Sequence, residues 1–163
     1  MSLAILNPLV MSLMTFMGNT SNILNDTPEN ARLIKLRSPI ISNGNLVRLT
    51  KLVDKDFKAF DIPIGFNIED GPEGLAAATD RVCKEAEKHA RDHKKAILIL
   101  NDADLSADVA PIPALLAVSA VNQHLARRGL RASSSIVVKT DEAREVHHIA
   151  LLLAYGATAV NPN

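Results

Sequence analysis

Two short, mainly apolar runs separated by a helical pattern constrain this chain more than any other feature. Residues 96–100 read AILIL and residues 135–138 read SIVV. Runs of this kind are typical of strands that are covered on both faces, as in a parallel sheet. Residues 112–128 between them have a helical pattern, which ends at Gly129, a residue suited to a left-handed helix cap. The sequence therefore predicts a β-α-β unit.

A long amphipathic helix precedes the first apolar run. It begins at Pro72, and apolar residues repeat at helical spacing on one face while charges fill the other. A strand at residues 60–68 precedes this helix, and Pro63 and Gly65 place the strand at a sheet edge or at a bulge. The apolar stripe of the helix consists of Leu75, Ala78, Val82 and Ala86.

Another helix and another strand follow the second apolar run. Thr140 is expected to cap this helix, because Asp141 and Glu142 in its first turn suit the positive end of a helix dipole. Gly156 is expected to end the helix, and residues 158–160 begin the next strand. The helix is expected to bury one face, formed by Val146, Ile149, Ala150 and Leu153.

The order β-α-β-α-β-α-β predicts an α/β fold with parallel strands and right-handed crossovers. We expect these repeats, in residues 57–163, to be part of a (β/α)8 TIM-barrel-like domain, with an open sheet as the alternative. Residues 1–56 are expected to form a mostly helical or irregular N-terminal part. Its helices are predicted at about residues 8–17, 28–36 and 43–52.

Composition excludes several classes of partner. The formal net charge is zero, so the chain has no electrostatic signature of binding to nucleic acid or to acidic lipid. Residues 1–17 are apolar but are shorter than the roughly 20 residues that span a membrane, and they lack the basic start of a secretion signal. We expect them to form a buried helix that favours self-association where its partner surface is absent. The single cysteine fits a reducing, cytoplasmic location.

Asp102 and Asp104 are the strongest catalytic candidates. An apolar strand followed by Asp-x-Asp resembles haloacid-dehalogenase-like phosphatases, and Thr140 ends a later strand, where that family keeps a hydroxyl. In this alternative function, one aspartate is the nucleophile, the other is the acid/base, and Mg²⁺ assists. However, no strand end after Thr140 carries the acidic pair that this family uses to hold the metal.

Histidine and cysteine give weaker signals. His147 and His148 are neighbours on a predicted helix and point about 100° apart, so they are poorly placed to bind one metal ion, and His124 is distant in sequence. We expect them to have a structural or interface role. Cys83 lies near an apolar helical stripe and is expected to be a core residue. No catalytic, cofactor-binding or metal-binding residue is assigned from these patterns.

Longer segments carry a family signature when they are read together and in order. In the C-terminal half they are APIPALLAV at 110–118, EAREVHH at 142–148, LLLAYGA at 151–157 and AVNP at 159–162. In the N-terminal half, LVMSL at 9–13, NIL at 22–24, PENA at 28–31 and SPI at 38–40 occur in the same order. The set resembles the central domain of the large subunit of glutamate synthase. Residues 101–103 depart from it, since they read NDA where the family usually has Ser-Asp-Arg.

The resemblance implies that residues 1–56 and 57–163 together form a fragment of one central domain. Such a domain connects a glutamine amidotransferase domain to a domain that binds FMN and an iron–sulfur cluster, and it helps to form an ammonia tunnel in glutamate biosynthesis. The catalytic, flavin and cluster residues of the family lie outside the matched region, so none is transferred to a position here. The chain alone is expected to be inactive. A free-standing, non-catalytic interaction module is a further alternative.

Overall fold

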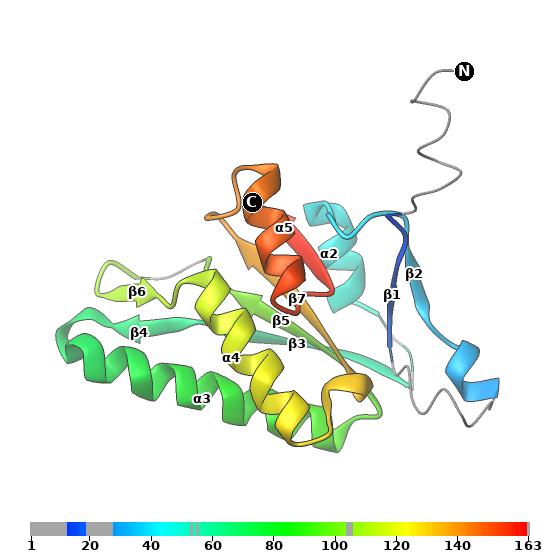
Figure 1. The fold of residues 1–163 in the computed structure, drawn as a ribbon, viewed down its shortest axis with the longest axis horizontal. Coiled ribbons are helices and arrows are strands. Elements are labelled where there is room, and N and C mark those ends of the chain that lie inside the picture. Colours follow the sequence, from blue (N-terminus) through cyan, green and yellow to red (C-terminus); the bar gives the residue numbers. More distant parts are fainter. Residues whose placement is uncertain (1–12, 19–27, 53, 55, 104–105, 163) are drawn as a thin grey trace.

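The computed structural model describes residues 13–18, 28–52, 54, 56–103 and 106–162. Its centre is a parallel four-stranded sheet crossed by three helices (Figure 1). Strand order in this sheet follows chain order, and the β-α alternation predicted for this part of the chain is confirmed. The elements are β3 (Phe57–Pro63), α3 (Gly71–Asp92), β5 (Lys95–Asn101), α4 (Ala114–Arg127), β7 (Ser134–Thr140), α5 (Val146–Ala154) and β8 (Ala159–Pro162).

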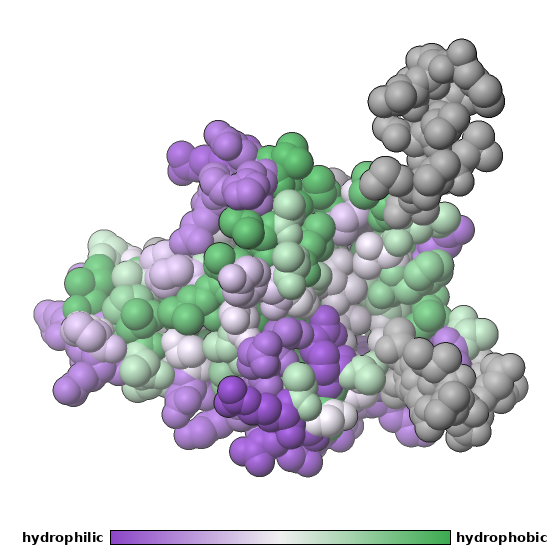
Figure 2. All heavy atoms as spheres, viewed as in Figure 1, coloured by the Kyte–Doolittle hydropathy of each residue, from purple (hydrophilic) through white to green (hydrophobic). Residues whose placement is uncertain are grey.

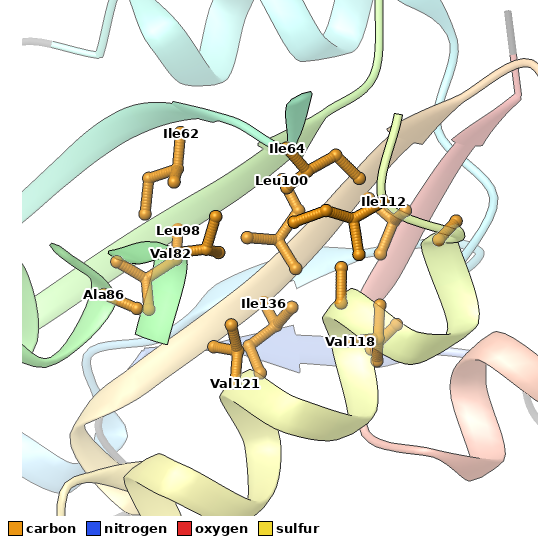
Figure 3. Packing of buried hydrophobic residues seen from close by; sticks show 14 of the residues in the cluster. Ile62, Ile64, Val82, Ala86, Leu98, Leu100, Ile112, Val118, Val121 and Ile136 are labelled. Atoms are coloured by element: carbon orange, nitrogen blue, oxygen red, sulfur yellow. The ribbon is translucent and has the colours of Figure 1, made fainter. Parts of the chain in front are cut away.

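Side chains of β5 alternate between two hydrophobic cores, as the pleat of a strand requires. Leu98 and Leu100 point to the face that α3, α4 and α5 cover, where they share a cluster with Val82 of α3 (Figure 3). Ile97 and Ile99 belong to a second cluster, on the opposite face. Every residue of β5 is buried, as the apolar run predicted. All three crossover helices therefore lie on one face of the sheet.

The opposite face is covered by the N-terminal part of the chain. Its helix, α2 (Asn43–Thr50), confirms the helix predicted at 43–52 and buries Leu46 and Leu49 in the second cluster. Ser42 caps this helix, since its side chain accepts a hydrogen bond from the backbone N–H of Asn45 at 3.4 Å.

Where it is described, the rest of the N-terminal part is not the helical segment that the sequence predicted. Of the helix expected at 8–17, residues 8–12 lie outside the described residues, and Thr15–Met17 form strand β1. The apolar helix and the self-association expected for residues 1–17 therefore stay predictions. The helix expected at 28–36 is a 3-10 turn, η1 (Pro28–Ala31), followed by strand β2 (Ile34–Leu36), which pairs antiparallel with β1. The prediction was wrong because this pairing joins distant segments and leaves no periodic pattern in the sequence.

The strand predicted at 60–68 is split at Ile64. It consists of β3 and of a short strand, β4 (Gly65–Asn67), which pairs antiparallel with β6 (Val109–Pro111). The Ile64 N–H donates to Asn101 O at 2.9 Å, and the Ile64 carbonyl accepts from the Ile112 N–H at 2.7 Å. β3 lies at the edge of the main sheet, which confirms the edge position argued from Pro63.

Helix α5 begins later than predicted. Thr140 ends β7 and does not cap a helix. Its hydroxyl instead donates a hydrogen bond to Asp102 and accepts one from the Glu142 N–H at 3.1 Å. The predicted buried face was correct only in part, because Ile149 and Leu153 pack against the core. Val146, in contrast, is 82% exposed, and the fully buried residue of α5 is Leu152. The helix has no charged residue, so its sequence pattern could not indicate which side faces the core.

The sheet formed by the described residues is open, so it does not by itself confirm that these repeats are part of a (β/α)8 TIM-barrel-like domain. Residues 39–41 run along the outer edge of β8. The Ile41 N–H donates to Val160 O at 2.9 Å, and the Val160 N–H donates to Pro39 O at 2.7 Å. None of the helices that the structure describes is long and apolar enough to cross a membrane.

Candidate functional site

The carboxyl ends of β5 and β7 bring three polar side chains together. Asp102 directly follows β5, Thr140 ends the neighbouring strand, and Glu142 comes two residues later. Thr140 Oγ1 donates to Asp102 Oδ2 and accepts from the backbone N–H of Glu142. This edge of a parallel sheet is where α/β proteins usually place a ligand site. The sequence had singled out Asp102 and Thr140, and the structure does bring them together.

Burial is the main reason why the pKa of Asp102 is raised above its ordinary value. The nearby carboxylates of Asp141 and Glu142 raise this pKa further, whereas hydrogen bonds from Thr140 and from the Asp141 backbone lower it. Asp102 Oδ1 is buried and has no hydrogen-bond partner in the described part of the chain. The raised pKa makes ionisation of Asp102 less favourable than that of an ordinary aspartate, and an aspartyl nucleophile must be ionised.

The phosphatase alternative is not favoured by this arrangement. Asp104, its second catalytic residue, lies outside the described residues. Within the part that the structure describes, no three His, Cys, Asp or Glu side chains lie close enough together to hold a metal ion. The described residues around Asp102 therefore show neither the second catalytic carboxylate nor a site for Mg²⁺.

Glu142 occupies the N-terminus of α4. Its Oε2 accepts a hydrogen bond from the Ala114 N–H at 2.9 Å, while the preceding residue, Pro113, provides no side-chain cap. A helix N-terminus attracts anions because its N–H groups and its dipole point outwards. Since this chain places its own carboxylate there, the negative charge of Glu142 disfavours a second anion at the N-terminus of α4.

The iron–sulfur cluster that the resemblance implies for the larger enzyme does not fit the residues of this chain. An iron–sulfur cluster needs several cysteine thiolates, and the chain has one cysteine. That residue, Cys83, is 6% exposed inside the core, as predicted. Burial and the nearby charge of Asp80 raise the pKa of its thiol, which disfavours the thiolate form that binds metals.

The histidines singled out in the sequence do not converge. His147 and His148 are both exposed on α5. His124, on α4, lies with Nε2 2.5 Å from Glu87 Oε2 of α3 and so links two crossover helices. His124 therefore has a structural role and does not form a metal site with His147 and His148 among the described residues.

Sequence reasoning missed an apolar pocket of about 230 Å³ between α4 and α5. Helix α5 has no charged residue, although most of its length is exposed or only partly buried. Hydrophobic residues gather over α5 on the molecular surface (Figure 2). The missing charge in residues 146–154 is the signal that could have revealed this surface. The α4–α5 pocket is lined by Ala114, Leu115, Glu142, Ala143, His148, Leu151 and Leu152.

Known proteins resemble this chain over nearly its whole length. It is similar to the glutamate synthase [NADPH] large chain of Bacillus subtilis (strain 168), with 43% identity over 159 residues. It is also similar to the ferredoxin-dependent glutamate synthase of Pyropia yezoensis, with 38% identity over 156 residues. The glutamate synthase [NADH] of Schizosaccharomyces pombe is 33% identical over 156 residues.

These alignments cover 98%, 94% and 94% of this chain but only 10%, 10% and 7% of the three relatives. The chain thus spans about a tenth of the length of the first two relatives. The model of the glutamate synthase central domain family matches residues 4–163. The resemblance read from the sequence motifs is therefore confirmed, and the chain belongs to the glutamate synthase central domain family.

Proposed function

We propose that this chain is a non-catalytic scaffold within a glutamate synthase large chain. In this role it connects the glutamine amidotransferase part to the part that binds FMN and the iron–sulfur cluster, and it helps to form the ammonia tunnel. The proposal places the protein in the cytoplasm and assigns both cofactors to the neighbouring domains. Family membership supports it, and so does the small share of each relative that the chain covers.

The exposed, uncharged surface of α5 is the observation that carries the proposal. Val146 is 82% exposed, and Leu116 and Tyr155 are also exposed. Covering an apolar side chain of this size gains about 1.5–3 kcal/mol, so a surface of this kind favours a partner. A neighbouring domain that covers α5 and the α4–α5 pocket would hold this chain in a fixed place.

We also infer that the sheet is an arc of a (β/α)8-like barrel in the longer protein. Strand order follows chain order from β3 to β8, and the three crossover helices lie on one face. That is the arrangement of barrel strands, whereas a doubly wound sheet reverses its strand order and carries helices on both faces. Helix α2 would then lie on the inner side of the arc, and residues 39–41 would extend the arc beyond β8.

The test uses the full large chain that carries this sequence. We expect Val146→Glu to lower glutamate formation from glutamine, because a charge on α5 would loosen the contact with the neighbouring domain. Glutamate formation from added ammonium should stay close to wild type, and ammonia released from glutamine should escape into solution. Ile68→Glu, at an exposed residue of the turn η2 (Ile68–Asp70), is the matched control.

Equal loss of the glutamine-dependent and the ammonium-dependent activities would contradict the connecting role, and so would no loss of either. Urea unfolding of the isolated chain checks that Val146→Glu leaves the fold intact. This is expected because the residue makes little contact with the core.

A further inference from the structure

A second surface feature lies on the α2 side of the molecule. A groove of about 360 Å³ runs between β2 and α2, and residues 34–38 line it without interruption. We call it the β2–α2 groove. Its lining residues are Ile34, Lys35, Leu36, Arg37, Ser38, Ile40, Ile41, Asn45, Arg48, Leu49 and Leu52.

Part of the groove is apolar. Ile34, Leu36 and Leu49 belong to the second hydrophobic cluster or pack against it, and their side chains also line the groove. Ile40 is 46% exposed and Leu52 is 39% exposed. A groove that leaves aliphatic side chains in contact with water is suited to the apolar side chains of a partner.

The groove is also positively charged. Lys35, Arg37 and Arg48 line it and are exposed, and no ion pair joins them to a carboxylate among the described residues. None of the lining residues is acidic. Arg32, just before β2, differs from these three residues, because it forms ion pairs with Asp54 at 2.9 Å and with Asp56 at 2.7 Å. The three groove cations therefore favour an anionic partner.

The backbone of β2 adds a third feature. β2 pairs with β1 along one edge, and their sheet has two strands in the part of the chain that the structure describes. Because consecutive residues 34–38 line the groove, it follows the course of the strand. A strand that pairs on one side only can form main-chain hydrogen bonds with an added extended segment on the other.

We propose that the β2–α2 groove binds an extended, acidic peptide segment with apolar side chains at alternate positions. Alternation places the apolar side chains of such a segment against Ile40 and Leu52 and its carboxylates near the cations. A nucleic acid would meet the same charges, but it has no aliphatic side chains for the apolar part. The groove lies beside α2, on the opposite face of the sheet from α5, so this inference does not depend on the connecting role.

The experiment measures binding of a fluorescein-labelled peptide in which Glu and Val alternate, by fluorescence anisotropy with the whole chain. We expect the double variant Arg37→Glu, Arg48→Glu to weaken binding by about tenfold or more, because two attractions become repulsions. Arg127→Glu, at an exposed residue of α4, reverses a charge away from the groove and should leave binding unchanged.

Two further probes separate the contributions of the groove. A peptide in which Glu and Ser alternate should bind at least about tenfold more weakly, since it lacks the apolar side chains that the groove would cover. Binding should also weaken as salt rises, because exposed charges are screened. Equal affinity for the Glu-Ser peptide, tighter binding of a single-stranded oligonucleotide, or an unaltered affinity in the double variant would each overturn the proposal.

Discussion

Glu142 lies across the N-terminus of helix α4, where its Oε2 accepts a hydrogen bond from the Ala114 N–H at 2.9 Å. The loop after β7 is thereby fastened to the helix after β5, although 28 positions separate the two residues. Glu142 thereby caps α4, because the side chain of the N-cap residue Pro113 cannot accept a hydrogen bond.

We expect Glu142→Ala to lower the free energy of unfolding by about 1 kcal/mol, as the loss of a helix cap does. Urea unfolding followed by circular dichroism measures this change. Glu145→Ala is the control, because Glu145 is exposed and its side chain makes no cap bond to α5. The role of Glu142 as a cap is refuted if the two variants lose the same amount of stability.

Asp102 should give stability a recognisable pH dependence. Its pKa is raised in the folded protein, mainly by burial, so the folded state holds this proton more tightly than the unfolded state. The group therefore contributes stability below its ordinary pKa of 3.8, and this contribution is lost as pH rises through the raised value. Wild type should become less stable relative to Asp102→Asn over that interval.

Urea unfolding of both proteins at a series of pH values measures this difference, because the other carboxylates titrate in both proteins and cancel. A difference between wild type and Asp102→Asn that stays constant with pH would contradict the raised pKa of Asp102.

Arg131 is partly buried and joins three parts of the chain through hydrogen bonds. It donates to Asn122 Oδ1 at 2.7 Å, to Ser134 O at 2.7 Å and to Gly156 O at 2.8 Å. Burial also lowers the pKa of its guanidinium. We expect Arg131→Ala to cost about 2–4 kcal/mol of unfolding free energy, because it leaves these acceptors without their donor.

The matched variant is Arg127→Ala, which removes an exposed guanidinium from α4. It should change stability by no more than about 0.5 kcal/mol. Urea midpoints for the two variants test the comparison, and similar midpoints would argue against a connecting role for Arg131.

Two glycines should respond in opposite directions to replacement by alanine. Gly156 has a φ of +119°, and a Cβ there would come within 2.3 Å of Asn122 Cγ. Gly156→Ala should therefore cost about 1–3 kcal/mol. At Gly44, in α2, the nearest atom to an added Cβ is 4.0 Å away. Gly44→Ala should therefore raise the free energy of unfolding by about 0.5–1 kcal/mol. Melting temperatures of the two variants should fall on opposite sides of wild type.

Long, regular patterns predicted the C-terminal part well. The run at 96–100 indicated β5 because a strand covered on both faces needs apolar residues throughout. Ala78, Val82 and Ala86 indicated the buried face of α3 because charges marked its other face. Helix α5 lacked such a contrast, so its buried face was predicted only in part.

The N-terminal part and the surface features could not be predicted in the same way. β1 and β2 have three residues each, and each is a strand only because it pairs with the other. Strands this short show no alternating pattern of apolar and polar residues in the sequence. Asp102 and Thr140 were recognised as strand-end residues, but the partner of Glu142 was not, because its bond reaches a helix 28 positions away. The β2–α2 groove likewise depends on side chains that meet only after folding.

The hydrogen bonds between residues 39–41 and β8 can form only after β8 has been synthesised. Asn161 Nδ2 donates to Ile41 O across 120 positions of sequence. During synthesis, α2 leaves the ribosome long before its partner strand exists, while the helices and strands between them can already begin to assemble. Residues 39–41 therefore cannot pair with β8 until late in synthesis, and their backbone N–H and C=O groups stay bonded to water until then.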